Sequence, residues 1–160
     1  MANSPSSIKR HRWTNGAVVS IPLTNGSHSY GQMFNAPEHA LFNVKTTDEI
    51  PPEDVVLHSA ICRLWVMGYA HSQGRWIKVG NATVSNSLQE PVRRCNQDAL
   101  NPEIIRLTHD GCDGPLGTIE DCDSLECAAV WDPKHVEDRL RNHFTVVPNE
   151  WVESLRPKRD

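Results

Sequence analysis

The residues of this 160-residue chain that are best suited to chemistry are the acids between Arg106 and Lys134, an interval without any Lys or Arg. Crowded carboxylates can act as general acids and bases, and they can also attract a basic protein surface. No phosphate-binding glycine motif or candidate base stands beside them, so they are typical of a solvated surface or of a patch that steers a basic partner. The acids that we expect in this patch are Asp110, Asp113, Glu120, Asp121, Asp123 and Glu126.

The cysteines and histidines are the second set of residues that could bind a metal or act in catalysis. The five cysteines are an odd number, so they cannot all pair, and without an export signal we expect reduced thiols. Three of them, Cys112, Cys122 and Cys127, lie near His109, but their spacing departs from the tight pairs of structural zinc sites. A zinc site and a disulfide between two of these cysteines stay open as minor alternatives, and we predict no metal, no cofactor and no catalytic residue.

The other members of this set have simpler interpretations. Cys62 and Cys127 are expected to be small buried hydrophobes, because they are surrounded by apolar residues. Four further histidines stand alone in the sequence and are expected to be surface or satisfied core residues; they are His28, His39, His58 and His71.

Composition predicts one soluble globular domain. The chain has 38% hydrophobic and 22% charged residues, and its net charge of −4 argues against a nucleic-acid partner. It has neither a membrane-spanning stretch nor a secretory signal, which favours the cytoplasm. We expect a flexible basic tail at residues 1–12, a single domain at 13–155 and a basic tail at 156–160.

The elements that must position these residues are mostly strands. Residues 17–23 and 27–34 flank Asn25-Gly26 and predict a hairpin with a two-residue turn, which would place Ile21 opposite Tyr30. A short third strand is expected at 41–44, and residues 61–69 and 75–81 predict a central strand and its partner in a second hairpin. A further strand is expected within 102–111, and a short buried element at 127–131.

The clearest helix follows Asp132, which can cap it, and Pro133, which suits a first helical position. Apolar residues recur every four positions from Val136, so this helix is expected to pack on the sheet. Glu137 and Arg141 are expected to pair on another face, mainly as a solubility feature.

Three stretches together resemble the immunity protein 26 family of bacterial polymorphic toxin systems. TNGAVVSIPLTNGSHSYGQMF is similar to the family's opening hairpin, and GRWIKVGN followed by Pro91 is similar to its Trp-x-aliphatic-aliphatic-Gly segment. ECAAVWDPKHVEDRLRNHF, with Trp151 after it, resembles the family's closing strand and helix. The chain departs from the pattern in having Ala17 where an acid is common, and in its acidic, cysteine-bearing loop.

The resemblance implies an α+β fold, mainly a curled, hairpin-rich antiparallel sheet with a carboxy-terminal helix packed on it; whether the sheet closes into a barrel stays open. It also implies a non-enzymatic cytoplasmic protein that binds and neutralises a cognate toxin, with neither nucleic acid nor membrane as partner. Since many toxin effectors are nucleases with basic substrate sites, we expect the acidic set above to be the toxin contact. The alternatives are a small β-rich ribonuclease-like enzyme and a zinc-binding module.

Overall fold

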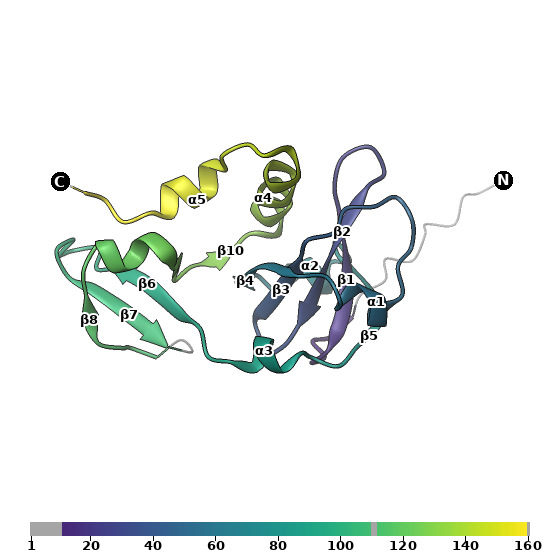
Figure 1. The fold of residues 1–160 in the computed structure, drawn as a ribbon, viewed down its shortest axis with the longest axis horizontal. Coiled ribbons are helices and arrows are strands. Elements are labelled where there is room, and N and C mark those ends of the chain that lie inside the picture. The colour runs from purple at the N-terminus through teal and green to yellow at the C-terminus, as the bar shows by residue number, and fades with distance from the viewer. Residues whose placement is uncertain (1–10, 110–111, 160) are drawn as a thin grey trace.

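The computed structural model describes residues 11–109 and 112–159 and contains two open β-sheets placed end to end (Figure 1). The first sheet has the strand order β10-β4-β3-β2-β1-β5, and the second has the order β8-β7-β6-β9. The strands of the first sheet are β1 (Ala17–Pro22), β2 (His28–Met33), β3 (Glu38–Phe42), β4 (Ala60–Val66), β5 (Ile77–Asn81) and β10 (Val130–Trp131). Those of the second are β6 (Arg93–Gln97), β7 (Ile105–His109), β8 (Leu116–Gly117) and β9 (Glu126–Cys127).

Short helices connect the strands, and two helices close the chain. They are α1 (Pro52–Val55), α2 (Tyr69–Ser72), α3 (Asn86–Gln89), the 3-10 helix η1 (Glu120–Ser124), α4 (Pro133–Thr145) and α5 (Glu150–Leu155). The predicted α+β class with a carboxy-terminal helix on the sheet is confirmed. Over the described residues neither sheet closes into a barrel, and no helix there is long and apolar enough to cross a lipid bilayer.

The first hairpin forms as predicted, but its register is shifted by one residue. Ser20, and not Ile21, lies opposite Tyr30. The reason is that Leu23 donates its backbone N–H to Ser27, which leaves a three-residue loop instead of a two-residue turn. Asn25 and Gly26 both have positive φ within that loop, so the Asn-Gly signal marked the turn correctly but not its length.

The predicted second hairpin is wrong. β4 pairs with β3 and β10, whereas β5 crosses to the opposite edge of the sheet and pairs with β1. Between them, α2 turns the chain, and Trp76 follows it into the core with 0% exposure. Burial of this indole is worth about 2–3 kcal/mol or more, which favours the crossover over a local hairpin.

Helix α4 covers one face of the first sheet, and the predicted cap is confirmed because the Asp132 side chain accepts the N–H of Lys134. Val136 and Leu140 enter a core with Leu64 and Val66 of β4. The opposite face of the sheet has its own core, into which Leu88 of α3 packs. That core consists of Val18, Tyr30, Phe34, Ala40, Phe42, Val44, Val55 and Leu88.

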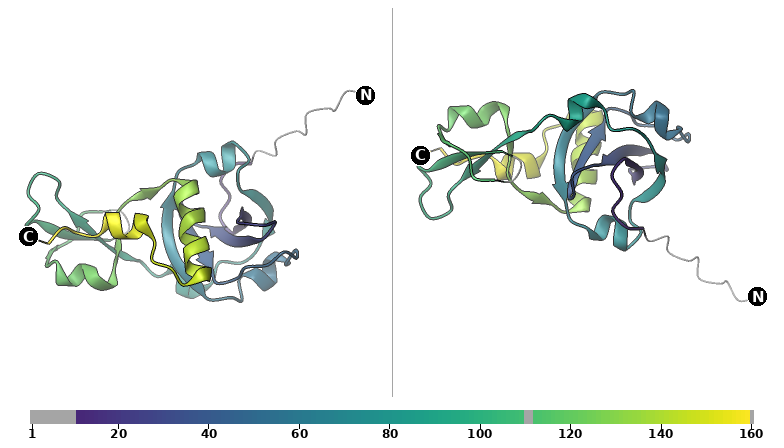
Figure 2. Two further views of the ribbon diagram at one scale, coloured as in Figure 1. Left: turned by 90° about the horizontal axis from the view of Figure 1, so that it is seen from above. Right: turned by 90° about the horizontal axis from the view of Figure 1, so that it is seen from below.

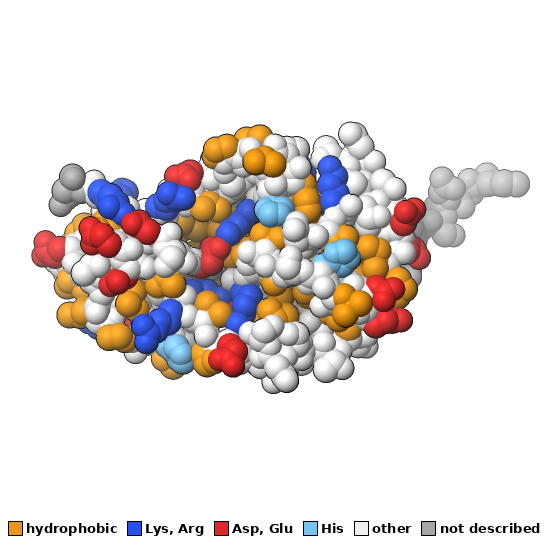
Figure 3. All heavy atoms as spheres, in the orientation of Figure 1, with side chains coloured by type: hydrophobic (Ala, Val, Ile, Leu, Met, Phe, Trp, Pro, Cys, Tyr) orange, Lys and Arg blue, Asp and Glu red, His pale blue; other side chains and the backbone are white. Residues whose placement is uncertain are grey.

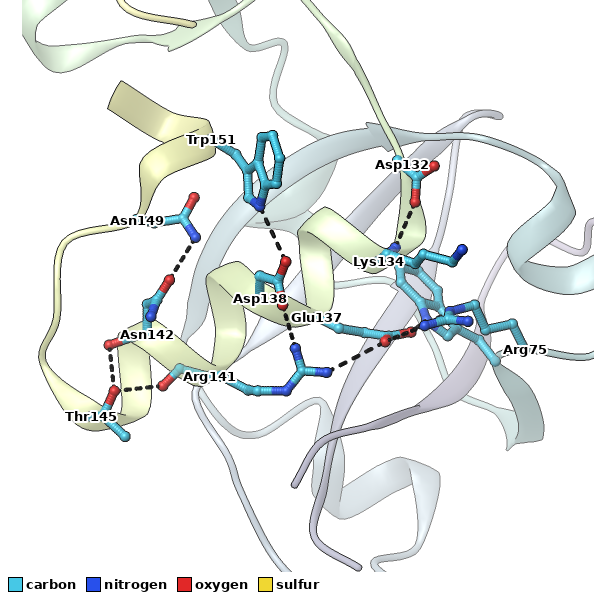
Figure 4. A network of polar contacts seen from close by, with 11 residues as sticks. Arg75, Asp132, Lys134, Glu137, Asp138, Arg141, Asn142, Thr145, Asn149 and Trp151 are labelled. Carbon is cyan, nitrogen blue, oxygen red and sulfur yellow. Dashed lines mark hydrogen bonds and ion pairs between the residues drawn. The ribbon is translucent and has the colours of Figure 1, made fainter. Parts of the chain in front are cut away.

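Glu137 is not a solubility feature, contrary to the sequence prediction. Its side chain is buried, and it accepts two hydrogen bonds of 2.7 Å from Arg75 and one of 3.0 Å from the Trp76 indole (Figure 4). Arg141 lies 3.7 Å from the same carboxylate. The carboxylate therefore fixes α4 to the segment between α2 and β5.

The second sheet forms a separate small core around Cys95, Ile105, Leu107 and Cys122. Cys95 and Cys122 form a disulfide with a Cα–Cα distance of 5.4 Å, so the expectation of reduced thiols is wrong at these two positions. Spacing in the sequence could not identify this pair, because β6 and η1 approach each other only after β7 folds back antiparallel to β6.

Helix α5 and the residues after it run from α4 back along the second sheet (Figure 2). Trp151 stacks on His135 of α4 with ring centroids 3.6 Å apart, and its indole donates to Asp138 (Figure 4). At the other end, the backbone of Lys158 exchanges two hydrogen bonds with the Gln97 side chain of β6. This segment thus links α4 to the second sheet.

Replacing Glu137 by Gln should lower the free energy of unfolding by about 2 kcal/mol, because Arg75 loses its buried partner. Urea denaturation followed by tryptophan fluorescence measures the change. The matched control is Glu153→Gln, which breaks an exposed pair with Arg156 and should change stability by less than about 0.5 kcal/mol. Equal effects of the two substitutions would contradict the anchoring role of Glu137.

Replacing Cys122 by Ser should cost about 3 kcal/mol, because the disulfide closes a sequence separation of 27 residues. Denaturation without reductant provides the comparison with the wild-type protein. Cys112→Ser is the control, since Cys112 is free and exposed and its loss should leave stability unchanged. A stability loss in the Cys112 variant alone would mean that the pairing is different.

Candidate functional site

The acidic residues predicted as a contact surface lie on the second sheet and its loops. Asp113 lies between β7 and β8, and Glu126 begins β9. The three acids between them in the sequence belong to η1; they are Glu120, Asp121 and Asp123. Asp110 lies outside the described residues. Figure 3 shows that Asp and Glu side chains gather at this end of the molecule, with Lys and Arg side chains among them.

Three of these acids already have partners within the protein. Asp121 accepts the backbone N–H of Thr118, Asp123 pairs with Arg159 at 2.5 Å, and Glu126 forms two hydrogen bonds with Arg139. Asp113 and Glu120 are exposed and have no such partner among the described residues. The surface therefore carries less uncompensated charge than the sequence suggests, because distant arginines fold onto it.

A second charged cluster, which sequence analysis missed, lies where the two sheets meet. Glu38 at the start of β3 is buried, and a single oxygen of its carboxylate, Oε1, accepts from Arg63 at 3.0 Å and from Arg94 at 2.9 Å. Arg63 comes from β4 of the first sheet and Arg94 from β6 of the second. We call these three residues the Glu38 cluster; it is the charged connection between the sheets.

Aromatic rings support both guanidinium groups of the Glu38 cluster. Arg63 lies over the Phe34 ring at 4.8 Å, and Arg94 lies over the Trp65 ring at 4.4 Å. Contacts of this kind are worth about 0.5–2 kcal/mol and favour a planar cation. Nothing in the local sequence signals the cluster, since its members come from three strands and Glu38 stands in an ordinary apolar strand.

A groove of about 690 Å³ opens beside the Glu38 cluster. It is lined by Asn35, Ala36, Pro37, Glu38, Trp65, Arg94 and Val130. In the space-filling view, Lys and Arg side chains occupy the hollow between the two parts of the molecule (Figure 3). We call this the inter-sheet groove.

The free thiols of Cys62 and Cys127 are poorly suited to nucleophilic catalysis. Burial raises the pKa of the Cys62 thiol to about 12, and burial together with Glu126 also raises the pKa of Cys127. A thiol with a raised pKa stays protonated at neutral pH, whereas catalysis needs the thiolate. No three His, Cys, Asp or Glu side chains come together as a metal site in residues 11–109 and 112–159.

Two histidines that look isolated in the sequence form a buried pair. His39 and His71 are joined by a 2.9 Å hydrogen bond between their Nε2 atoms, and the rings stack. Nδ1 of His39 lies 3.3 Å from the Pro37 carbonyl oxygen. If the neutral His39 ring carries its proton on Nδ1 and donates it to this carbonyl, its Nε2 accepts the hydrogen bond from Nε2–H of His71. Burial and the neighbouring ring lower the pKa of His39 to about 3, and burial and His11 lower that of His71 to about 4.

Comparison with known proteins gives one match. A family model described as Immunity protein 26 matches residues 14–104, which is more than half of the chain and includes strands β1 to β6. No curated protein and no solved structure matches the chain.

The neutral histidine pair predicts that the protein loses stability as pH falls below about 6.5. An unfolded chain protonates histidine near pH 6.5, while the folded chain does not do so until about pH 4, so acid favours unfolding. Between pH 7.5 and 5.5 each histidine should reduce the free energy of unfolding by about 1 kcal/mol.

Urea denaturation at these two pH values tests this prediction. The His39→Gln/His71→Gln variant should lose less stability between them than the wild-type protein. His58→Gln, at an exposed position, is the control and should behave like the wild-type protein. An identical pH dependence in the double variant would show that the pair does not stay neutral.

Proposed function

The chain belongs to the immunity protein 26 family, and we propose that it binds a cognate toxin effector and blocks it without catalysing a reaction. The observation that carries this proposal is the family match over residues 14–104. An inhibitor needs only a complementary surface that covers the toxin's active site or a region beside it. The proposed place of action is the bacterial cytoplasm.

The chemistry of the described residues supports binding over catalysis. The Cys62 thiol stays protonated at neutral pH, and two buried glutamates, Glu38 and Glu137, are held by arginines. Both oxygens of Glu137 already accept hydrogen bonds, so this carboxylate has no free position from which to move a proton on a substrate. What remains accessible at the second sheet is a charged surface, which suits recognition of a protein.

We propose the acidic end of the second sheet as one toxin contact. Asp113, Glu120 and Asp121 are exposed and have no cationic partner among the described residues, so they provide its uncompensated charge, and Asp110 follows β7 in the sequence. Asp123 and Glu126 shape this surface through their arginine partners within the protein. Opposite charges on a basic toxin surface would speed association and set the orientation of the complex.

Cytoplasmic action would expose the disulfide to reducing thiols, which is unusual for a stable structural bond. The location of the bond within the fold offers protection. Cys95 is 1% exposed and Cys122 is 6% exposed, so an external thiolate has little access to either sulfur.

The experiment that tests the function uses the gene next to the one that encodes this chain. Cells that express the neighbour alone should stop growing, and co-expression of this protein should restore growth and yield a stable complex on co-purification. A neighbour that is not toxic, together with the absence of a complex, would overturn the proposal. The purified protein would then be assayed for ribonuclease activity, the enzymatic alternative.

Charge reversal tests the proposed acidic contact. We expect Asp113→Lys combined with Glu120→Lys to weaken toxin binding about tenfold or more and to reduce its salt dependence, since rim charges act through long-range attraction. Binding kinetics at low and high salt measure both effects. Glu49→Lys, an exposed substitution in the loop between β3 and α1, is the control. Equal affinities of the double variant and this control would contradict the proposed contact.

A further inference from the structure

We propose that the inter-sheet groove binds a carboxylate, and that in the complex this group is an Asp or Glu side chain of the toxin. The inference rests on the proposed function for the identity of the partner. Its chemical part, the preference for a single negative charge, rests on the Glu38 cluster alone.

The floor of the groove is a row of three residues in register across three strands. Trp65 of β4 is paired with Glu38 of β3 on one side and with Val130 of β10 on the other. Directly paired residues point to the same face of a sheet, so the row presents a carboxylate, an indole and an apolar side chain side by side. Arg94 from the second sheet lies above the indole.

The charges of the Glu38 cluster, beside the groove, do not balance. Two guanidinium groups, those of Arg63 and Arg94, share one oxygen of Glu38, while the nearby Glu126 is matched by its own arginine, Arg139. Arg94 uses only Nη2 for its bonds to Glu38 and to the Arg63 carbonyl. Its other two nitrogens have no acceptor among the described residues. One positive charge is therefore left without a counter-ion.

The location of this charge gives it energetic weight. Arg94 is 3% exposed, so water hydrates it poorly. Glu38 is shared between two arginines and so neutralises Arg94 only in part, and a second anion would be attracted more strongly than at an open surface because the effective dielectric constant is lower. Nε and Nη1 point away from each other, so each free nitrogen can donate one hydrogen bond to a carboxylate oxygen.

The size of the imbalance favours a carboxylate over a phosphate or a nucleic acid. A carboxylate carries one negative charge, which neutralises the surplus. A phosphate monoester would bring nearly two charges next to Glu38. A nucleic acid would also bring its phosphates toward a chain with a net charge of −4. The volume of about 690 Å³ admits an amino-acid side chain, and Trp65 and Val130 supply apolar walls for its methylene groups.

A carboxylate built into the groove tests the chemical part. Val130 is 52% exposed and lines the groove beside Trp65, so Val130→Glu places an anion there and Val130→Gln is its neutral isostere. We expect the Glu variant to melt about 2–4 °C higher than the Gln variant at low salt, and the difference to disappear in 1 M NaCl. Equal or lower melting of the Glu variant at low salt would overturn the proposal.

The same pair of variants tests the partner. The built-in carboxylate would occupy the groove, so Val130→Glu should weaken binding of the co-purified toxin at least tenfold relative to Val130→Gln. Equal affinities of the two variants would overturn the toxin assignment while leaving the proposed function intact. If wild-type protein and both variants all fail to bind, the proposed function itself is wrong, and the toxin assignment falls with it.

Discussion

One carboxylate oxygen joins the two halves of this structure. Oε1 of Glu38 receives a guanidinium from each sheet, Arg63 from the first and Arg94 from the second. Because all three side chains are largely withdrawn from water, loss of Glu38 would leave two guanidinium groups without their shared counter-ion, which is far more destabilising than loss of a surface ion pair. The relative placement of the sheets, and with it the groove between them, depends on this contact.

Local signals in the sequence predicted the local structure well. Asn25-Gly26 marked a turn between two strands, and Asp132-Pro133 marked the start of α4, because in each case the decisive backbone conformation is set by adjacent residues. The register of the hairpin and the destination of β5 were not predictable in the same way. Both depend on which side chains reach the core, as Trp76 does, and this is a property of the whole sheet.

In the candidate sites, too, features set by neighbouring residues were predictable and features set by distant residues were not. Sequence located the acidic segment because its residues are contiguous, but it could not show that Arg139 and Arg159, from beyond that segment, neutralise part of it. It missed the Glu38 cluster entirely, since its three members are separated along the chain and each is unremarkable in its own surroundings. The cysteine pairing was hidden for the same reason, because Cys95 and Cys122 belong to different elements of the second sheet.

The order of strands in the first sheet constrains how the chain can fold during synthesis. β10 is an edge strand that pairs in parallel with β4, although the entire second sheet lies between them in the sequence. The pairing cannot form until residue 131 has left the ribosome, and α4, which covers Leu64 and Val66, follows later still. A nascent chain therefore exposes that apolar face of β4 while the second sheet is being synthesised. The Cys95–Cys122 disulfide shortens the effective loop between β4 and β10, so its early formation would shorten the time during which the exposed face can aggregate.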